Sequence, residues 1–208
     1  MRMMVNQYAF LVNSDACSGC KTCQVACKDK HDLPQGVHWR KVYEVTSGDW
    51  QQKAGAWVST VAAYNLSTTC NHCVNPVCIP PCPTGGIWKT DTGIVVIDEN
   101  NCRNCHACEL ACPYGAIIFN HARNTTTKCQ FCSDYLDMGL PPACVSACPN
   151  RALDFGEYAE LRKKYGTVDQ VFPLPDAKIA SPALVIIPHR NAALVQSRSP
   201  AVANREEV

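Results

Sequence analysis

The chain has 208 residues, of which 47% are hydrophobic and 18% are charged, and its formal net charge at pH 7 is +1. This neutral balance provides no field that would draw the chain to nucleic acid or to an anionic membrane, so we expect no nucleic-acid partner. The longest apolar run, residues 183–187, is far shorter than the roughly 20 residues that a membrane helix needs. We therefore expect no transmembrane helix.

Near the N-terminus, residues 8–12 are apolar but lead directly to the first cysteine, Cys17. They leave no room for the apolar region and small-residue cleavage site of an export signal. The sequence therefore predicts a protein that either stays in the cytoplasm or is exported together with another protein.

Sixteen cysteines dominate the sequence, and they fall into four groups of four with none left over. The groups are, in chain order, Cys17, Cys20, Cys23 and Cys27; Cys70, Cys73, Cys78 and Cys82; Cys102, Cys105, Cys108 and Cys112; and Cys129, Cys132, Cys144 and Cys148. Groups one and three read C-x2-C-x2-C-x3-C, and proline follows the fourth cysteine in groups two, three and four. Both features are typical of ferredoxins, so the spacing predicts four [4Fe-4S] clusters.

Two other uses of cysteine fit the spacing less well. Group four taken alone resembles the paired C-x2-4-C knuckles of a structural zinc site, but the third closely spaced cysteine of groups one and three has no role in binding zinc. A disulfide framework is typical of small secreted domains, whereas this chain is long enough to build a hydrophobic core.

The pairing of the groups follows from ferredoxin chemistry, in which the fourth cysteine of each motif binds the cluster of the other motif. Only residues 83–101 separate groups two and three, so these two groups should pair, and groups one and four then pair across the whole chain. The expected ligand sets are Cys17, Cys20, Cys23 and Cys148 (set 1); Cys129, Cys132, Cys144 and Cys27 (set 2); Cys70, Cys73, Cys78 and Cys112 (set 3); and Cys102, Cys105, Cys108 and Cys82 (set 4).

Secondary structure is expected to be short, because sixteen ligand positions force loops. Residues 87–89 and 94–97 flank an Asp-Thr-Gly turn and predict a hairpin. Residues 117–120 and 152–155 each follow a Cys-Pro pair at a similar offset and read as equivalent strands. Residues 157–164 have helical spacing and stop at Gly166, which predicts a helix.

These elements predict a loop-rich α+β fold of two interleaved bacterial ferredoxin-like modules, each holding two [4Fe-4S] clusters, with short β-hairpins, small helices and an extended C-terminal tail. Residues 1–60 form the first half of module 1 with an insertion, residues 61–122 the inserted module 2, and residues 123–170 the second half of module 1 with the helix. Five prolines beyond residue 171 predict an extended coil over residues 171–208.

Several other residues stand beside the ligands. His72 and His106 lie between cysteines, and we expect them to hydrogen bond near a cluster or to be exposed rather than to bind iron. Positive charge close to a cluster raises its reduction potential, which makes Lys28, Arg103 and Lys128 candidates for that role. The four tryptophans (Trp39, Trp50, Trp57 and Trp88) are expected to pack around the insertion.

The wider sequence resembles one family. The stretch Asp15-Ala16-Cys17-Ser18-Gly19-Cys20-Lys21-Thr22-Cys23 is similar to the iron–sulfur subunits of the dimethyl sulfoxide reductase family. The same is true of Gly48-Asp49-Trp50 and of residues 8–10, 26–29, 67–73, 111–116, 151–156, 160–166 and 203–208, so the resemblance extends over nearly the whole chain.

The resemblance implies an electron-transfer subunit that is not itself catalytic. In that family the subunit joins a molybdopterin-containing catalytic subunit to an integral-membrane anchor that oxidises quinol. It implies a hetero-oligomer held at the membrane by its partners, on the periplasmic face through co-export with the catalytic subunit. The terminal acceptor is chosen by the catalytic subunit and not by this chain.

One position refines the cluster content. Related nitrate reductase subunits have tryptophan where this chain has Cys102, and they hold a three-iron cluster there, so the resemblance implies four cubanes here. It also implies an electron path through sets 1 and 2, then 3 and 4, with the set of Cys102 nearest the quinol. A freestanding polyferredoxin and a zinc-binding scaffold remain the alternative functions.

Overall fold

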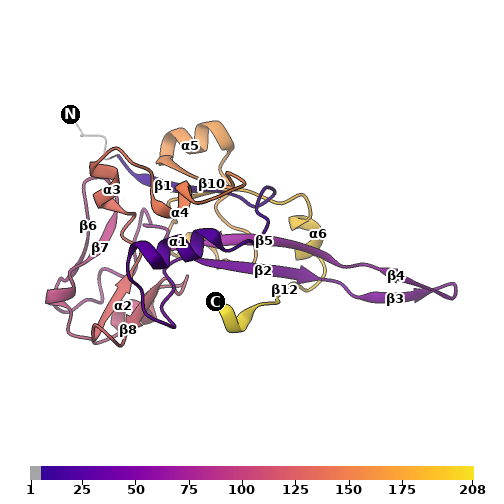
Figure 1. Cartoon of the computed structure of the whole chain (residues 1–208), viewed down its shortest axis with the longest axis horizontal. Coiled ribbons are helices and arrows are strands. Elements are labelled where there is room, and N and C mark those ends of the chain that lie inside the picture. The colour runs from indigo at the N-terminus through magenta and orange to yellow at the C-terminus, as the bar shows by residue number, and fades with distance from the viewer. Residues whose placement is uncertain (1–5) are drawn as a thin grey trace.

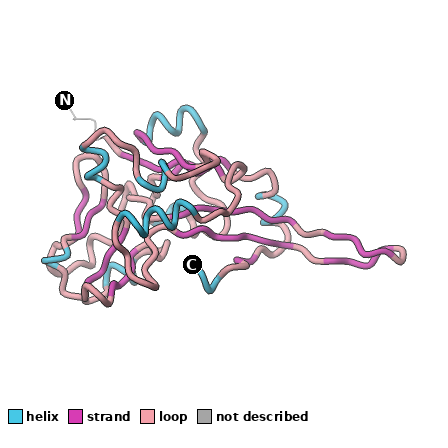
Figure 2. Tube along the Cα trace, in the orientation of Figure 1, coloured by secondary structure: helices cyan, strands magenta, loops and turns pink. Residues whose placement is uncertain are grey.

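The structure is a computed structural model that describes residues 6–208, so residues 1–5 of the predicted module 1 lie outside the described residues. It is an α+β fold of short helices and short strands joined by many loops (Figures 1 and 2). None of its helices within residues 6–208 is long and apolar enough to cross a bilayer.

A three-stranded sheet brings distant parts of the chain together. Its central strand β1 (Tyr8–Asn13) pairs antiparallel with β10 (Leu153–Glu157) and parallel with β11 (Leu184–Ile187). Four consecutive residues of β1, from Ala9 to Val12, are at most 5% exposed. Because both faces of this strand are covered, its sequence is continuously apolar rather than alternating.

The C-terminal segment differs from the predicted extended coil. It contains a 3-10 helix (Ala177–Ile179), the strand β11, the helix α6 (Ala192–Gln196), the two-residue strand β12 (Ala201–Val202) and a last 3-10 helix (Arg205–Glu207). The prolines do interrupt the segment, but the apolar run between two of them is buried: Val185 and Ile186 are 0% exposed. Burial of these β-branched side chains favours a strand over coil.

The insertion forms a long β-hairpin. Strands β2 (Lys41–Ser47) and β5 (Ala62–Thr68) pair antiparallel, and β12 adds to the free edge of β2. The hairpin then continues as β3 (Trp50–Lys53) and β4 (Ala56–Ser59), which extend away from the rest of the molecule as an arm (Figure 1).

Three of the four tryptophans are not packed around the insertion as expected. Trp39 is buried at 3% exposure, but Trp50 and Trp57 on the arm are 62% and 66% exposed, and Trp88 is 45% exposed. Every residue of β3 and β4 is exposed, because no other layer covers the arm.

Two smaller hairpins lie at the opposite end of the molecule from the arm (Figure 1). The predicted hairpin is confirmed as β6 (Ile87–Lys89) paired with β7 (Val95–Ile97). The predicted strand at residues 117–120 is confirmed as β8 (Ile117–Asn120), which pairs with β9 (Thr125–Lys128). Between them lie a 3-10 helix (Glu99–Asn101) and the short helix α2 (Ala107–Ala111).

The remaining helices follow the cysteine groups or cover the central sheet. Helix α1 (Thr22–Lys30) packs against α4 (Ala143–Ser146), and α3 (Ser133–Asp137) precedes α4. Helix α5 (Tyr158–Tyr165) confirms the predicted helix to within one residue at each end, and Gly166 caps it with a φ of 96°. It packs on β1, β10 and β11.

Candidate metal centres

The four cysteine groups share a local backbone conformation. In every group the residue two positions after the first cysteine has a positive φ: 74° at Gly19, 43° at His72, 54° at Asn104 and 60° at Phe131. A left-handed residue curls the chain so that successive amide groups turn toward one concavity, which favours an anion there. The groups therefore form four equivalent loops, including groups two and four, whose spacing departs from that of one and three.

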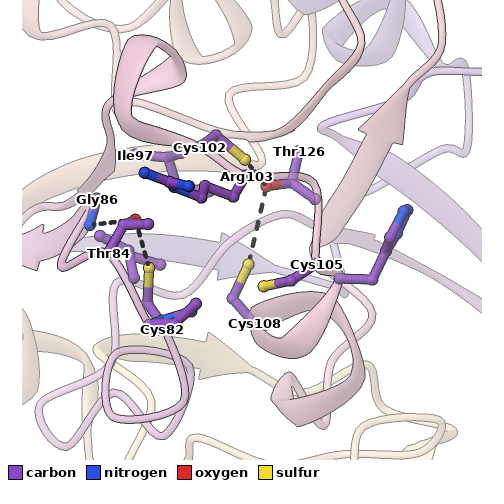
Figure 3. Close-up of a pocket in the computed structure, with 12 residues that line it drawn as sticks. Cys82, Thr84, Gly86, Ile97, Cys102, Arg103, Cys105, Cys108 and Thr126 are labelled. Carbon is purple, nitrogen blue, oxygen red and sulfur yellow. Dashed lines mark hydrogen bonds between the residues drawn. The ribbon is translucent and has the colours of Figure 1, made fainter.

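The sulfurs of Cys82, Cys102, Cys105 and Cys108 face one common cavity (Figure 3). Three of these residues belong to group three, and Cys82 is the fourth cysteine of group two. The structure thus brings together the four cysteines expected as set 4. Their neighbours Thr84, Gly86 and Ile97 come from the segment that joins the two groups.

Hydroxyl groups reach the sulfurs of this cavity. Thr126 Oγ1, on β9, lies 3.3 Å from Cys102 Sγ and 3.8 Å from Cys108 Sγ, and Thr84 Oγ1 lies 3.5 Å from Cys82 Sγ. Burial works against the thiolate of Cys102, but the Thr125 and Thr126 hydroxyls and nearby amides outweigh it and lower the pKa of Cys102 to about 7. This cavity therefore favours sulfur in the anionic form that binds metal.

A second cavity is lined by Cys17, Cys20, Cys23 and Cys148. These are the four cysteines expected as set 1, and Cys148 comes from the far end of the chain. Ser67 on β5 places its Oγ 3.4 Å from Cys23 Sγ, and the Ala152 amide donates to Cys148 Sγ at 3.2 Å. The pairing of β1 with β10 brings group one and Cys148 into this contact.

All four cysteines of set 2 are buried, set 3 has no exposed cysteine, and the thiols of each set act on one another electrostatically. Burial raises the pKa of Cys27, and the thiolates of Cys129, Cys144 and Cys132 raise it further. In the same way, burial and the neighbouring Cys70, Cys112 and Cys78 raise the pKa of Cys73. The thiols of each set are therefore neighbours in the fold.

All sixteen cysteines are free thiols, so no disulfide framework is present. Among residues 6–208, no three His, Cys, Asp or Glu side chains converge closely enough to hold a single metal ion. In the two cavities, four sulfurs instead surround a space. A cubane fits this arrangement, because its four irons lie at separate corners and each takes one thiolate.

Two buried cations accompany the thiols. Lys128, which the sequence singled out, is 2% exposed, and its Nζ donates to the carbonyls of Cys129, at 2.9 Å, and of Val95. Arg40, which the sequence analysis missed, is 1% exposed and donates from Nη1 to Ser67 Oγ at 3.0 Å. Burial opposes the charge of Arg40, but the thiolates of Cys144 and Cys23 hold its pKa above its usual value.

A signal for the burial of Arg40 exists in the sequence. Arg40 comes two residues before the buried Val42, the spacing that puts two side chains on one face of a β-strand, although residues 39 and 40 form a bend that precedes β2. Trp39 contacts the opposite side, where its Nε1 donates to Thr127 Oγ1 at 3.1 Å.

The other residues noted from the sequence have separate environments. His72 is 0% exposed and its Nδ1 accepts from the Val95 amide at 3.0 Å, whereas His106 contacts Glu109 at 2.7 Å near the surface. Arg103 lines the cavity of set 4 at an exposed position, and Lys28 donates to the Pro34 carbonyl at 2.5 Å.

Comparisons with known proteins agree with this geometry. The family of 4Fe-4S dicluster domains matches residues 61–158. The sequence is 46% identical over 205 residues to an anaerobic dimethyl sulfoxide reductase chain from Escherichia coli strain K12, covering 99% of this chain and 100% of that protein. It is 36% identical over 164 residues to a tetrathionate reductase subunit of Salmonella typhimurium, covering 78% of this chain and 63% of that protein. It is also 36% identical over 163 residues to the thiosulfate reductase electron transfer subunit of Salmonella typhi, covering 77% of this chain and 81% of that protein.

The cysteine loops and the matched domain define an iron–sulfur protein of the ferredoxin type. Identity over its full length is more specific than the domain alone. This protein belongs to the family of iron–sulfur subunits of dimethyl sulfoxide reductases, as its sequence motifs predicted.

Proposed function

We propose that this chain is an electron-transfer subunit that carries four [4Fe-4S] clusters and relays electrons from a quinol-oxidising membrane anchor to a molybdopterin catalytic subunit. The observation that carries the proposal is the meeting of cysteines from two different groups around one cavity, as Cys82 does with group three. Such crossed ligation is typical of proteins that hold clusters in close pairs. The clusters supply one-electron redox chemistry, and no side chain of this protein need act as acid, base or nucleophile.

The proposed ligands are the four sets given by the sequence. The two cavities support sets 1 and 4, and the mutual effects of the thiols on their pKa values support sets 2 and 3. We infer that sets 1 and 2 belong to one ferredoxin-like module, and that sets 3 and 4 form a second module inserted within it. The pairing of β1 with β10, which joins residues near both ends of module 1, supports this interleaving.

The exposure of the cysteines supports the proposed order of the path. Cys20 in set 1 and Cys105 in set 4 are exposed, whereas all four cysteines of set 2 are buried. An electron must enter and leave at the surface, and the steps between need protection from solvent. We therefore assign set 1 to the exit toward the catalytic subunit and set 4 to the entry from the quinol side.

The proposed assembly is a hetero-oligomer held at the membrane by its anchor, with this chain on the periplasmic face through co-export. The exposed Trp50 and Trp57 of the arm support a partner contact beyond the cluster-bearing body. A freestanding polyferredoxin has no use for such an arm. A zinc-binding scaffold does not account for the paired cysteine cavities or for the full-length similarity to reductase iron–sulfur subunits.

The variant Cys102→Ser in the assembled complex tests the relay. Serine offers a harder oxygen ligand, which should weaken one iron and favour a three-iron centre of higher potential that traps electrons. We expect turnover driven by quinol to collapse, while turnover driven by a small artificial donor that reduces the catalytic subunit directly persists. If both activities fell together with the complex intact, set 4 would not lie between quinol and catalyst.

A further inference from the structure

Arg40 is a fully buried cation without a carboxylate partner. Within the described residues, its guanidinium donates a hydrogen bond to Ser67 Oγ, while Nε and Nη2 are buried and have no acceptor there. None of the ion pairs found among residues 6–208 includes it. An isolated buried charge is strongly unfavourable, so a compensating anion is required nearby.

The surroundings of Arg40 offer one source of negative charge. The acceptor of its hydrogen bond, Ser67 Oγ, also contacts Cys23 Sγ of set 1 at 3.4 Å. The other thiolates whose charges act on the guanidinium are those of Cys144, Cys129 and Cys27, which all belong to set 2. Arg40 therefore lies between the two proposed ligand sets of module 1.

An aromatic pair limits the space on one side of the guanidinium. Its Cζ lies 4.8 Å from the centre of the Phe10 ring, and Phe10 stacks on Phe131 with 4.1 Å between ring centres. Both rings are at most 1% exposed. Because a low-dielectric wall weakens screening, the field of Arg40 acts strongly on the sulfur side.

We propose that Arg40 is a positioning residue that supplies the counter-charge shared by the clusters of sets 1 and 2, and that it raises the reduction potentials of both. The inference rests on the proposed clusters. Each reduction adds one electron to an already anionic group, with no bond made or broken, and a fixed cation stabilises the added charge. The two unpartnered nitrogens, Nε and Nη2, are the donors available to cluster sulfur.

The test is a potentiometric titration of the purified protein with all four clusters present, followed by electron paramagnetic resonance. The variant Arg40→Met removes the charge while keeping much of the side-chain volume. At a fixed solution potential, we expect the reduced-to-oxidised ratio of two of the four clusters to fall at least tenfold. This corresponds to a fall of about 59 mV in their midpoint potentials. The other two midpoints should remain at their wild-type values.

Two control variants distinguish an effect of the charge of Arg40 from an effect of its packing and from an effect of any nearby positive charge. Arg40→Lys keeps a buried cation. At the same solution potential, the reduced-to-oxidised ratio of each of the four clusters should stay within about threefold of its wild-type value. Lys41→Met removes a positive charge from the next residue, the first of β2, whose side chain is only half-buried, and it should move none.

The outcomes distinguish this inference from the proposed function. Protein without iron would overturn the clusters themselves. Four intact clusters with unchanged midpoints in Arg40→Met, or shifts confined to sets 3 and 4, would overturn the role of Arg40 alone. A second neutral variant, Arg40→Gln, covers the case in which Arg40→Met loses iron. If both neutral variants lose iron, the inference requires that the lost irons come from sets 1 and 2 and that Arg40→Lys keeps every cluster. Any other pattern of iron loss would overturn it.

Discussion

The hydroxyl of Thr126 offers a specific test of how the polypeptide tunes the cluster of set 4. Thr126 is 1% exposed, and its Oγ1 lies 3.3 Å from Cys102 Sγ and 3.8 Å from Cys108 Sγ. Sulfur bound to iron carries no proton, so the hydroxyl must donate. It has one proton, so Thr126→Val removes one hydrogen bond, principally the one to Cys102, and replaces the hydroxyl with a methyl group of similar size.

The size of the expected shift in midpoint potential follows from the negative charge of the sulfur that accepts the hydrogen bond. A hydrogen bond to a charged group contributes about 1.5–3 kcal/mol, but only the difference between the two oxidation states affects the potential. Because the cluster is anionic in both states, we take half of this energy, or about 0.75–1.5 kcal/mol. For a one-electron couple this equals a fall in midpoint potential of roughly 30–60 mV. The donor stabilises the more negative reduced state, so its removal lowers the potential.

The assay is a redox titration of the four clusters in Thr126→Val beside Thr127→Val. Thr127 is the next residue of β9, but its Oγ1 contacts Trp39 Nε1 and the Ile118 carbonyl instead of sulfur. Thr127→Val should leave every midpoint unchanged and should lower the free energy of unfolding by about 1–3 kcal/mol, because the buried Trp39 donor loses its acceptor. Equal shifts in the two variants, or none in Thr126→Val, would refute the reasoning.

Two further predictions test the pairing of the cysteine groups and the C-terminal strand. Cys148→Ser should disturb the cluster of Cys17, Cys20 and Cys23 and leave the spectroscopic signals of sets 3 and 4 intact; loss confined to the cluster of Cys129, Cys132 and Cys144 would show that each fourth cysteine stays with its own motif. Ile186→Ala should lower the free energy of unfolding by about 2–5 kcal/mol in a denaturant titration, because Ile186 is 0% exposed. The control Ile179→Ala, at a residue that is 49% exposed, should change this free energy by less than about 0.5 kcal/mol. Equal effects of these two substitutions would mean that β11 is not part of the core.

Short-range patterns predicted much of the local structure. The hairpin of β6 and β7 and the helix α5 appear where turn residues, β-branched runs and Gly166 placed them, because each depends on neighbouring residues. The cysteine spacing likewise indicated iron–sulfur chemistry and the family. These signals are local and strong, so they need no knowledge of the tertiary fold.

Features that depend on distant contacts were missed. The parallel pairing of β1 with β11 joins residues more than 170 positions apart, and the prolines around the apolar run obscured it. The arm was not predicted because its strands pair only with each other and bury nothing, so they have no core-facing pattern. Arg40 was overlooked because a charged residue is rarely buried unless a partner compensates it.

The positive φ values show why four unequal motifs can perform one role. Glycine occupies the left-handed position only in group one, at Gly19, while His72, Asn104 and Phe131 adopt it in the other groups. A left-handed backbone in a residue other than glycine is unfavourable, so composition alone does not predict it. The surrounding contacts, such as the packing of Phe131 on Phe10, maintain the conformation.

The most direct test of the account is the iron and acid-labile sulfide content of protein purified without oxygen. Four cubanes require about sixteen irons and about sixteen sulfides per chain, and we expect both values. Iron near zero with about four zincs per chain would contradict the proposal that this protein conducts electrons.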